Sequence, residues 1–157
     1  EDNEKSNILT KKVEEQNKKP CVFMSHDWGE NGEDHDKSKI LAKKLEEFGY
    51  HVWLDENELK TGDLLLPQIS DAIEQSICVL IVVTKGYQEK ANQKSFNYCS
   101  FEFQNTITSF TGKVIPIVTD ARMLNLTWPY PFGFLQSILF EDFTDASLFS
   151  GPVNDLN

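Results

Sequence analysis

The stretch ICVLIVVT, residues 77–84, decides the class of fold, because it is the most apolar strand-like run in the chain. Its side chains are largely β-branched, and polar segments lie on both sides of it. A run of this kind is typical of a strand that is buried on both faces, as in a parallel sheet. We therefore predict that residues 77–84 form a central strand of an α/β domain.

Four other short segments read as strands around this central run. They are CVFMS (21–25), HVWLD (51–55), KVIPIV (113–118) and SILFEDF (137–143). Helical patterns and short loops alternate with these strands, which favours parallel strands joined by right-handed crossovers. The expected architecture is a doubly wound α/β domain in which helices cover both faces of a parallel sheet.

Three segments between the strands carry apolar residues at helical spacing. The first is expected to end at Gly49, and the second covers residues 64–76, whereas the third begins near Ser95. Residues 85–94 are predicted to be a polar loop, and residues 120–136 to be irregular. The expected core positions are Ile40, Leu41, Leu45 and Phe48 in the first helix, Ile69, Ala72, Ile73 and Ser76 in the second, and Phe96, Cys99, Phe103, Ile107 and Phe110 in the third.

Composition limits the classes of partner. The chain has 157 residues, which suits one domain, and its net charge of −10 argues against a nucleic-acid or an acidic-membrane partner. No apolar run approaches the ~20 residues that span a bilayer. We expect a polar linker or flexible segment over residues 1–19, the folded domain over 20–146 and a tail over 147–157.

The three cysteines Cys21, Cys78 and Cys99 form no CxxC pair, and their number is odd. Buried free thiols are the simplest interpretation, and they indicate a reducing, intracellular compartment. The histidines show no spacing typical of metal ligands, and the acidic run 34–36 is typical of a solvated loop, so we expect no metal site. A cysteine hydrolase built on His26 and Cys99 is not supported by any spacing.

Ligands of doubly wound domains bind at the carboxyl ends of the strands, here residues 26–28, 55–62, 84–86 and 119–120. The first strand is followed by MSHDWGENGED, which lacks the GxGxxG spacing of a dinucleotide-binding Rossmann unit. No GxxxxGK[ST] phosphate-binding loop occurs. The central strand ends in VVTKGY, without the aspartate that a phosphoacceptor receiver domain needs.

The stretch NYCSFEF, residues 97–103, holds the single acidic residue between Glu89 and Asp120. Glu102 and Tyr98 are separated by one turn of the third predicted helix and flank its apolar stripe. From the residues alone, Glu102 is either an ordinary exposed helix residue or a carboxylate that lines a cleft beside the strand ends. The pattern leaves both interpretations open.

The order of these segments resembles that of the TIR domain family over roughly residues 20–145. The resemblance is carried, in order, by CVFMSHDW, VWLDENELKTG, ISDAIEQSICVLIVVTKGY, YCSFEF and KVIPIV. Each segment is a weak signal alone, but their order and separations together are specific. The resemblance implies a flavodoxin-like fold with a five-stranded parallel sheet.

TIR domains either signal by assembly alone or cleave the nicotinamide–ribose bond of NAD+ with one glutamate on the third helix. In the cleaving class that glutamate often follows a Trp by four residues or a Cys by three. This chain has Tyr98 and Cys99 at these positions, so it matches the cysteine form. The resemblance thus implies that Glu102 is catalytic, that NAD+ is a substrate rather than a cofactor, and that other TIR domains are partners.

The resemblance also implies the surroundings of the substrate. The loop after the first strand should border the cleft, and the loop over residues 55–64 corresponds to one that gates the pocket in similar enzymes. Trp28 either stacks on a base or is a half-buried aromatic residue, and Leu59 either binds or packs. The substrate-binding candidates are His26, Asp27, Trp28, Asp55, Leu59, Gly62 and Tyr98.

Three functions therefore remain to be compared. The first is an NAD+ glycohydrolase that releases nicotinamide and either ADP-ribose or a cyclic variant in signalling or defence in the cytoplasm. The second is a non-catalytic adaptor that associates with other TIR domains through residues 55–66. The third is a TIR-like sensor that binds a nucleotide without turnover.

Overall fold

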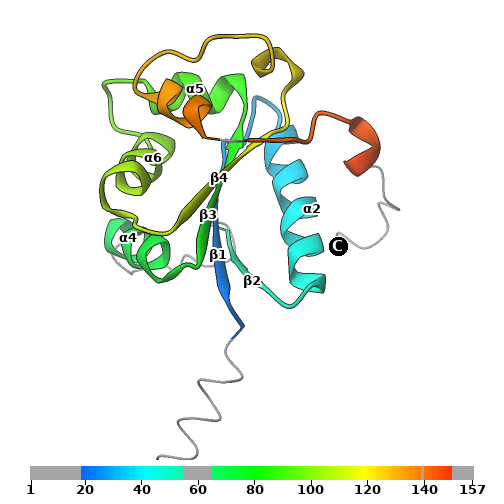
Figure 1. Cartoon of the computed structure of the whole chain (residues 1–157), viewed down its shortest axis with the longest axis vertical. Coiled ribbons are helices and arrows are strands. Elements are labelled where there is room, and N and C mark those ends of the chain that lie inside the picture. The colour runs from blue at the N-terminus through cyan, green and yellow to red at the C-terminus, as the bar shows by residue number, and fades with distance from the viewer. Residues whose placement is uncertain (1–18, 55–64, 139, 150–157) are drawn as a thin grey trace, which may run out of the picture.

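Parallel strands form the centre of the computed structural model, which describes residues 19–54, 65–138 and 140–149. Within these ranges, five strands form one sheet in the order β2-β1-β3-β4-β5 (Figure 1). The position of β3 in the middle of the sheet confirms the prediction for residues 77–84. The strands are β1 (Cys21–Ser25), β2 (His51–Trp53), β3 (Cys78–Val83), β4 (Lys113–Val118) and β5 (Glu141–Asp142).

All strand pairs are parallel, as the alternation of strands and helices predicted. The chain leaves β1 to form β2 on one side and then returns to form β3 on the other side. The point where the strand order reverses therefore lies between β1 and β3. In this register Ser25, the last residue of β1, is paired with Ile81.

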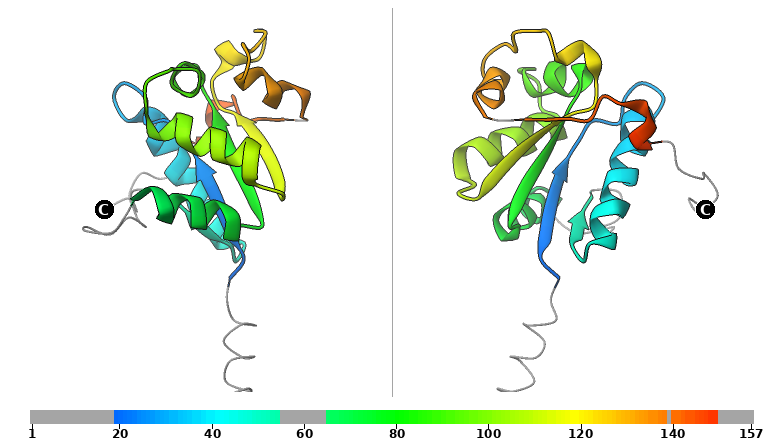
Figure 2. Two further views of the ribbon diagram at one scale, coloured as in Figure 1. Left: turned by 90° about the vertical axis from the view of Figure 1, so that its left-hand side faces the viewer. Right: turned by 45° about the vertical axis from the view of Figure 1, so that its right-hand side comes forward.

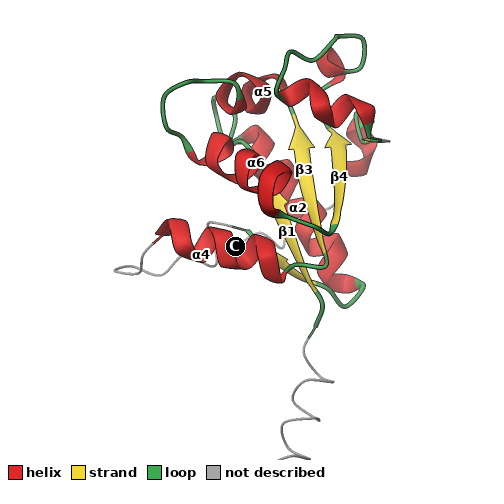
Figure 3. Cartoon of the chain, turned by 60° about the vertical axis from the view of Figure 1, so that its left-hand side comes forward, coloured by secondary structure: helices red, strands yellow, loops and turns green. Residues whose placement is uncertain are grey.

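Helices cover both faces of the sheet. Helix α2 (Glu33–Glu47) lies on one face, and α4 (Leu65–Gln75), α5 (Lys85–Ala91) and α6 (Tyr98–Ser109) lie on the other (Figures 1 and 2). Figure 3 shows α4 near the amino ends of the strands and α5 near their carboxyl ends. The architecture is the expected doubly wound, flavodoxin-like α/β fold.

Each face of the sheet has its own hydrophobic core, because successive side chains of a strand point to opposite faces. On β1, Met24 faces α2, whereas Phe23 faces the three-helix side. The α2 core includes Val22, Met24, Leu41, Val52, Leu80 and Val82. The other core includes Phe23, Ile69, Ile73, Val79, Ile81, Tyr87, Phe103 and Phe132.

The segment after β4 is irregular, as predicted, and contains the short 3-10 helices η1 (Ala121–Met123) and η2 (Phe132–Ser137). Its aromatic side chains are nonetheless part of the core, since Trp128 and Phe132 are buried. A Cβ atom at Gly133 would lie 2.2 Å from the backbone oxygen of Trp128, so this close approach requires glycine. The described chain ends with η3 (Ala146–Phe149).

The prediction of a polar loop over residues 85–94 is wrong, because α5 occupies most of it. The hydroxyl of Thr84 accepts a hydrogen bond from the backbone N–H of Tyr87 at 3.1 Å and caps the helix. Only Tyr87 and Ala91 supply buried apolar side chains, so seven residues show too little helical periodicity to be recognised.

The prediction that Phe48 and Phe96 lie in the core is also wrong. Phe96 is 65% exposed because α6 begins after it, at Tyr98, with the side chain of Asn97 as its N-cap. Phe48 is 83% exposed at the C-cap of α2. The last predicted strand is shorter than expected, since only Glu141 and Asp142 pair with β4.

Residues 1–18 of the predicted N-terminal linker and residues 150–157 of the predicted tail lie outside the described residues. Among the helices in the described ranges, none is long and apolar enough to cross a membrane.

Candidate functional site

The candidate site lies at the carboxyl end of β1, where the strand order reverses. Doubly wound domains bind their ligands at this position, because the two crossover connections leave in opposite directions. Ser25 ends the strand here, and residues 26–28 follow it. Helix α6 packs against β1 from the three-helix side and brings Glu102 to the same place.

Glu102 is buried, with 4% of its surface exposed, which excludes the interpretation as an ordinary exposed helix residue. The hydroxyl of Ser25 donates a hydrogen bond to its Oε2 atom at 2.5 Å. The same Ser25 oxygen lies 2.6 Å from the hydroxyl of Tyr87 on α5. The carboxylate is held by the Ser25 hydroxyl and is largely removed from solvent, so its field is screened weakly.

The loop after β1 is fixed to the first turn of α6. The thiol of Cys99 lies 3.6 Å from the backbone oxygen of His26 and donates to it. The Nε2 atom of His26 is 2.6 Å from Nδ1 of His35 on α2, and both histidines are buried. His26 is therefore held between α2 and α6, directly after Ser25 at the end of β1.

Asp27 is also buried and forms an ion pair with Lys90 of α5. The hydrogen bond that Lys90 donates to Asp27, together with the negative charge of Asp27, raises the pKa of Lys90 despite the opposing effect of burial. Gly86 makes this arrangement possible, since a Cβ atom there would lie 2.5 Å from Oδ2 of Asp27. The pair thus anchors the loop after β1 to α5.

Trp28 and Tyr98 contribute half-exposed aromatic rings beside these buried groups. The Trp28 ring stacks on the His35 ring with centroids 4.0 Å apart and an angle of 5° between the planes. It is still 47% exposed, and Tyr98 is 46% exposed. The rings of Tyr98 and the exposed Phe96 meet edge to face, with their centroids 5.7 Å apart.

The structure thus brings Glu102, His26 and Asp27 together at one end of β1, with Trp28 and Tyr98 on the adjoining loop and helix. Asp55, Leu59 and Gly62 lie outside the described residues, so their predicted roles stay predictions.

Four residues of this region were missed by sequence reasoning: Ser25, His35, Tyr87 and Lys90. Ser25 and Tyr87 contact each other across 62 positions of sequence, which no local pattern reveals. The one available signal was position, because Ser25 is the last residue of a predicted strand and therefore lies at its ligand-binding end.

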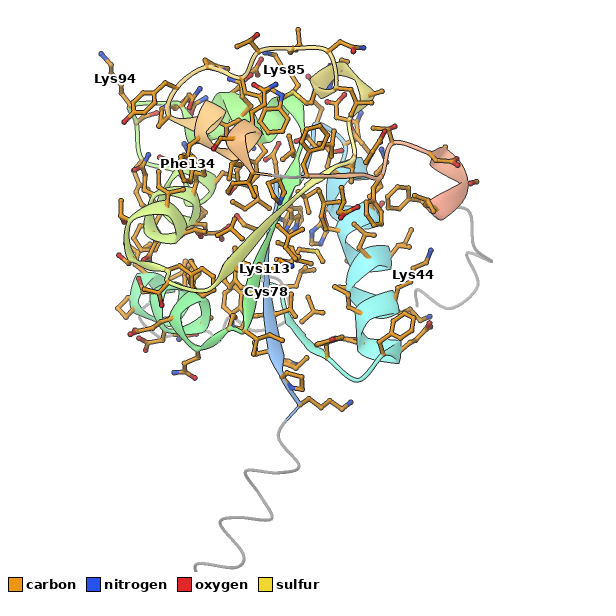
Figure 4. All side chains as sticks on the ribbon, viewed as in Figure 1. Lys44, Cys78, Lys85, Lys94, Lys113 and Phe134 are labelled. Atoms are coloured by element: carbon orange, nitrogen blue, oxygen red, sulfur yellow. The ribbon has the colours of Figure 1, made fainter. Side chains whose placement is uncertain are left out.

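The end of β4 meets α5 at the same edge of the sheet. Asp120 accepts a hydrogen bond from the backbone N–H of Lys85 at 3.0 Å and from the guanidinium group of Arg122 at 2.7 Å. Figure 4 shows Lys85 at this edge, whereas Cys78 and Lys113 lie toward the opposite ends of the strands. Within the described residues, no group of three or more His, Cys, Asp or Glu side chains is placed to hold a metal ion.

Comparison with known proteins agrees with this geometry. The TIR domain family model matches residues 22–151. Among solved structures, the chain is similar to a prokaryotic SEFIR domain, with a TM-score of 0.58 and 25% identity over 77% of this chain and 85% of that chain. It is also similar in fold to the TIR domain of the Toll-related receptor TRR-2 from Hydra magnipapillata, with a TM-score of 0.56 and 21% identity over 81% of this chain and 86% of that chain.

Among curated proteins, no significant match to the chain is found. The family model nevertheless covers most of the sequence, and the strand order and the helices on both faces agree with it. The chain therefore belongs to the TIR domain family, a family of signalling domains.

Proposed function

We propose that the chain is an NAD+ glycohydrolase in which Glu102 is the catalytic residue. One observation carries this proposal: a buried carboxylate lies at the carboxyl end of β1, at the reversal of strand order, held by the hydroxyl of Ser25. A buried carboxylate is uncommon in a protein core, because removing its charge from water is costly. A functional role explains why the chain retains it there.

The chemistry requires only one such group. The nicotinamide of NAD+ carries a positive charge, so it leaves as a neutral molecule when its bond to the ribose breaks, and no general acid is needed. The ribose then has oxocarbenium character, which a carboxylate in a weakly screening environment stabilises. Water attacks the ribose carbon and releases a proton, which gives ADP-ribose; capture by the adenine ring of the same molecule gives a cyclic product instead.

The neighbouring side chains suit the two ends of the substrate. The Trp28 ring is held flat against His35, and we propose that it stacks on a base of NAD+. We propose that Tyr98, one turn before Glu102, lines the other side of the substrate pocket. His26 and Asp27 keep the loop that carries Trp28 in place. Asp55, Leu59 and Gly62 complete the lining of the pocket.

The small exposure of Glu102 predicts how activity depends on assembly. Because only 4% of its surface is accessible, the ribose reaches the carboxylate only when the surrounding groups move. We propose that association with a second TIR domain favours this open arrangement in the cytoplasm. Specific activity should therefore rise with protein concentration rather than remain constant.

The test is nicotinamide release from NAD+ by the purified chain over a range of protein concentrations. Glu102→Gln should abolish release, since it keeps the shape of the side chain and removes its charge. Glu89→Gln, a change at an exposed glutamate of α5, is the matched control and should leave the rate unchanged. Absence of release from the wild type at every concentration contradicts the enzyme function, and full activity of Glu102→Gln contradicts the site.

One observation favours a non-catalytic adaptor as the second candidate. The exposed rings of Phe96 and Tyr98 lie together with the half-buried Phe101 at the start of α6, and this aromatic patch suits contact with another protein. An adaptor would associate without NAD+ turnover. Sedimentation velocity of the wild type and of Phe96→Asp tests whether the patch is an interface, because loss of association in the variant is expected only in that case. Association of the wild type without nicotinamide release would support the adaptor, since the proposed enzyme also associates.

A further inference from the structure

Three buried side chains from three different elements form one continuous chain of hydrogen bonds. Ser25 of β1 lies between Tyr87 of α5 and Glu102 of α6, at 2.6 Å from the first hydroxyl and 2.5 Å from the carboxylate. Their exposed fractions are 1%, 0% and 4%. Such a chain within a core is a strong constraint on the positions of its members.

The ionisation of Glu102 decides where each hydrogen lies. An ionised carboxylate can only accept, so the single hydrogen of the Ser25 hydroxyl is donated to Glu102. The Ser25 oxygen then has only acceptor capacity left toward Tyr87, which must donate its own hydrogen. Burial raises the pKa of Tyr87 well above 10, so the phenol keeps this hydrogen over the whole neutral range.

Protonation of Glu102 removes this order. A neutral carboxyl group carries a hydrogen itself and no longer requires donation from Ser25, so the hydrogens of the chain can be arranged in more than one way. The hydrogen bond that Ser25 donates is stronger to a charged carboxylate than to a neutral carboxyl group, so the arrangement of Tyr87 and Ser25 favours the ionised form of Glu102. Neither residue carries a formal charge, so together they support the negative charge without neutralising its field.

We propose that Tyr87, acting through Ser25, is a positioning residue that holds Glu102 ionised and in one orientation. This inference rests on the proposed function for its catalytic meaning, because a fixed carboxylate stabilises a developing ribose cation without reorganising. Tyr87 and Ser25 need not touch the substrate. Their effect should appear in kcat and in the pH at which Glu102 is protonated, and not in KM.

Other titratable groups lie on the elements packed against α6. Cys99 is one turn before Glu102 on the same helix, and His26 follows Ser25 on the β1 side. From α5 comes the ion pair of Lys90 with Asp27, and the acids of α4, Asp71 and Glu74, are exposed. A variant that leaves all of these groups intact isolates the contribution of the Tyr87 hydroxyl.

Tyr87→Phe is that variant, because it removes one hydroxyl and keeps the ring that packs against Phe132 at 5.8 Å between centroids. Tyr130→Phe, at a tyrosine that is 90% exposed, is the matched control. We expect Tyr87→Phe to reduce kcat about three- to tenfold at unchanged KM and to move the acidic limb of the rate profile upward by about half to one pH unit. The control should behave as the wild type.

A second measurement is independent of turnover. In protein labelled with 13C at the glutamate carboxyl groups, the resonance of Glu102 is identified by its absence in Glu102→Gln. Its titration midpoint should rise in Tyr87→Phe by about half to one pH unit and rise further in Ser25→Ala, which removes the direct donor. Ser25→Ala also provides the test if Tyr87→Phe does not fold.

The outcomes separate the inference from the proposed function. An unchanged Glu102 midpoint in both variants overturns the inference, whether or not the wild type cleaves NAD+. A changed KM with unchanged kcat in Tyr87→Phe also overturns it. If the midpoints shift as expected while the wild type releases no nicotinamide, the hydrogen-bonded control of Glu102 is supported and the proposed function alone fails.

Discussion

Asp120 joins the end of β4 to the start of α5, and its replacement by asparagine gives a quantitative test of this contact. Burial alone would raise the pKa of Asp120. Hydrogen bonds from the Arg122 side chain and from the backbone N–H groups of Lys85 and Arg122 outweigh burial and lower this pKa from 3.8 to about 2. The ionised carboxylate is thus favoured in the folded chain over the unfolded chain.

The magnitude follows from this difference in pKa. A fall from 3.8 to about 2 corresponds to about 2.4 kcal/mol of unfolding free energy, at about 1.36 kcal/mol per pKa unit. The Asp120 side chain is 13% exposed, but that of Arg122 is 73% exposed, so solvent screens part of the interaction. We therefore expect Asp120→Asn to lower the unfolding free energy by about 1–1.5 kcal/mol at pH 7.

The lowered pKa of Asp120 also determines how its contribution to stability changes with pH. A carboxylate with a lowered folded pKa stabilises the fold above its unfolded pKa, and this stabilisation is lost as the pH falls through the folded pKa. The difference between wild type and Asp120→Asn should therefore be full at pH 7 and decrease steadily from about pH 4 to about pH 2.

Urea unfolding followed by circular dichroism at several pH values measures both quantities. Asp71→Asn, at an exposed carboxylate of α4, is the control for removing one negative charge from a chain of net charge −10. An Asp120→Asn effect that equals the control, or that is as large at pH 3 as at pH 7, would refute the reasoning.

Three more predictions concern the elements around the candidate site, each measured as the free energy of unfolding in urea. Gly86→Ala should destabilise the chain by about 1–2 kcal/mol, because its new methyl group overlaps the Asp27 carboxylate. Thr84→Ala should lose about 1–2 kcal/mol with the N-cap of α5, whereas Thr84→Ser should restore most of it. Phe103→Ala should lower the unfolding free energy by about 3–5 kcal/mol, because Phe103 is in the core. Phe96→Ala, at a ring that is 65% exposed, should lower it by less than about 0.5 kcal/mol. Similar losses in the two variants would contradict the observed start of α6.

The strands could be predicted from sequence because a buried strand has a local signature. The β-branched run in β3 and the short apolar run in β1 show it without reference to any other part of the chain. Helix α5 has no comparable signature, since its stability comes from a cap and from two buried side chains within seven residues. Predicting α5 would have required knowledge of which side chains pack at the carboxyl end of β3.

The position of Glu102 on a helix near the strand ends was predictable, but its burial and its contact with the first strand were not. Helical periodicity identifies the apolar stripe of α6, whereas the cover over the edge of that stripe comes from Ser25 and from Tyr87 on α5. The contact between Ser25 and Glu102 spans 77 positions in the sequence. Such contacts depend on which strands and helices become neighbours in the fold. One sequence does not show which side chains then meet.

The stacking of Trp28 on His35 gives this protein a built-in optical probe. Of its three tryptophans, Trp53 and Trp128 are buried and Trp28 is 47% exposed, so emission at the red edge of the fluorescence spectrum comes mainly from Trp28. A nucleotide base stacked on the exposed part of the Trp28 ring would quench this emission. The part of the red-edge emission that Trp28→Phe lacks belongs to Trp28. Its intensity therefore reports ligand binding at the end of β1 without a label, in real time and before any product forms.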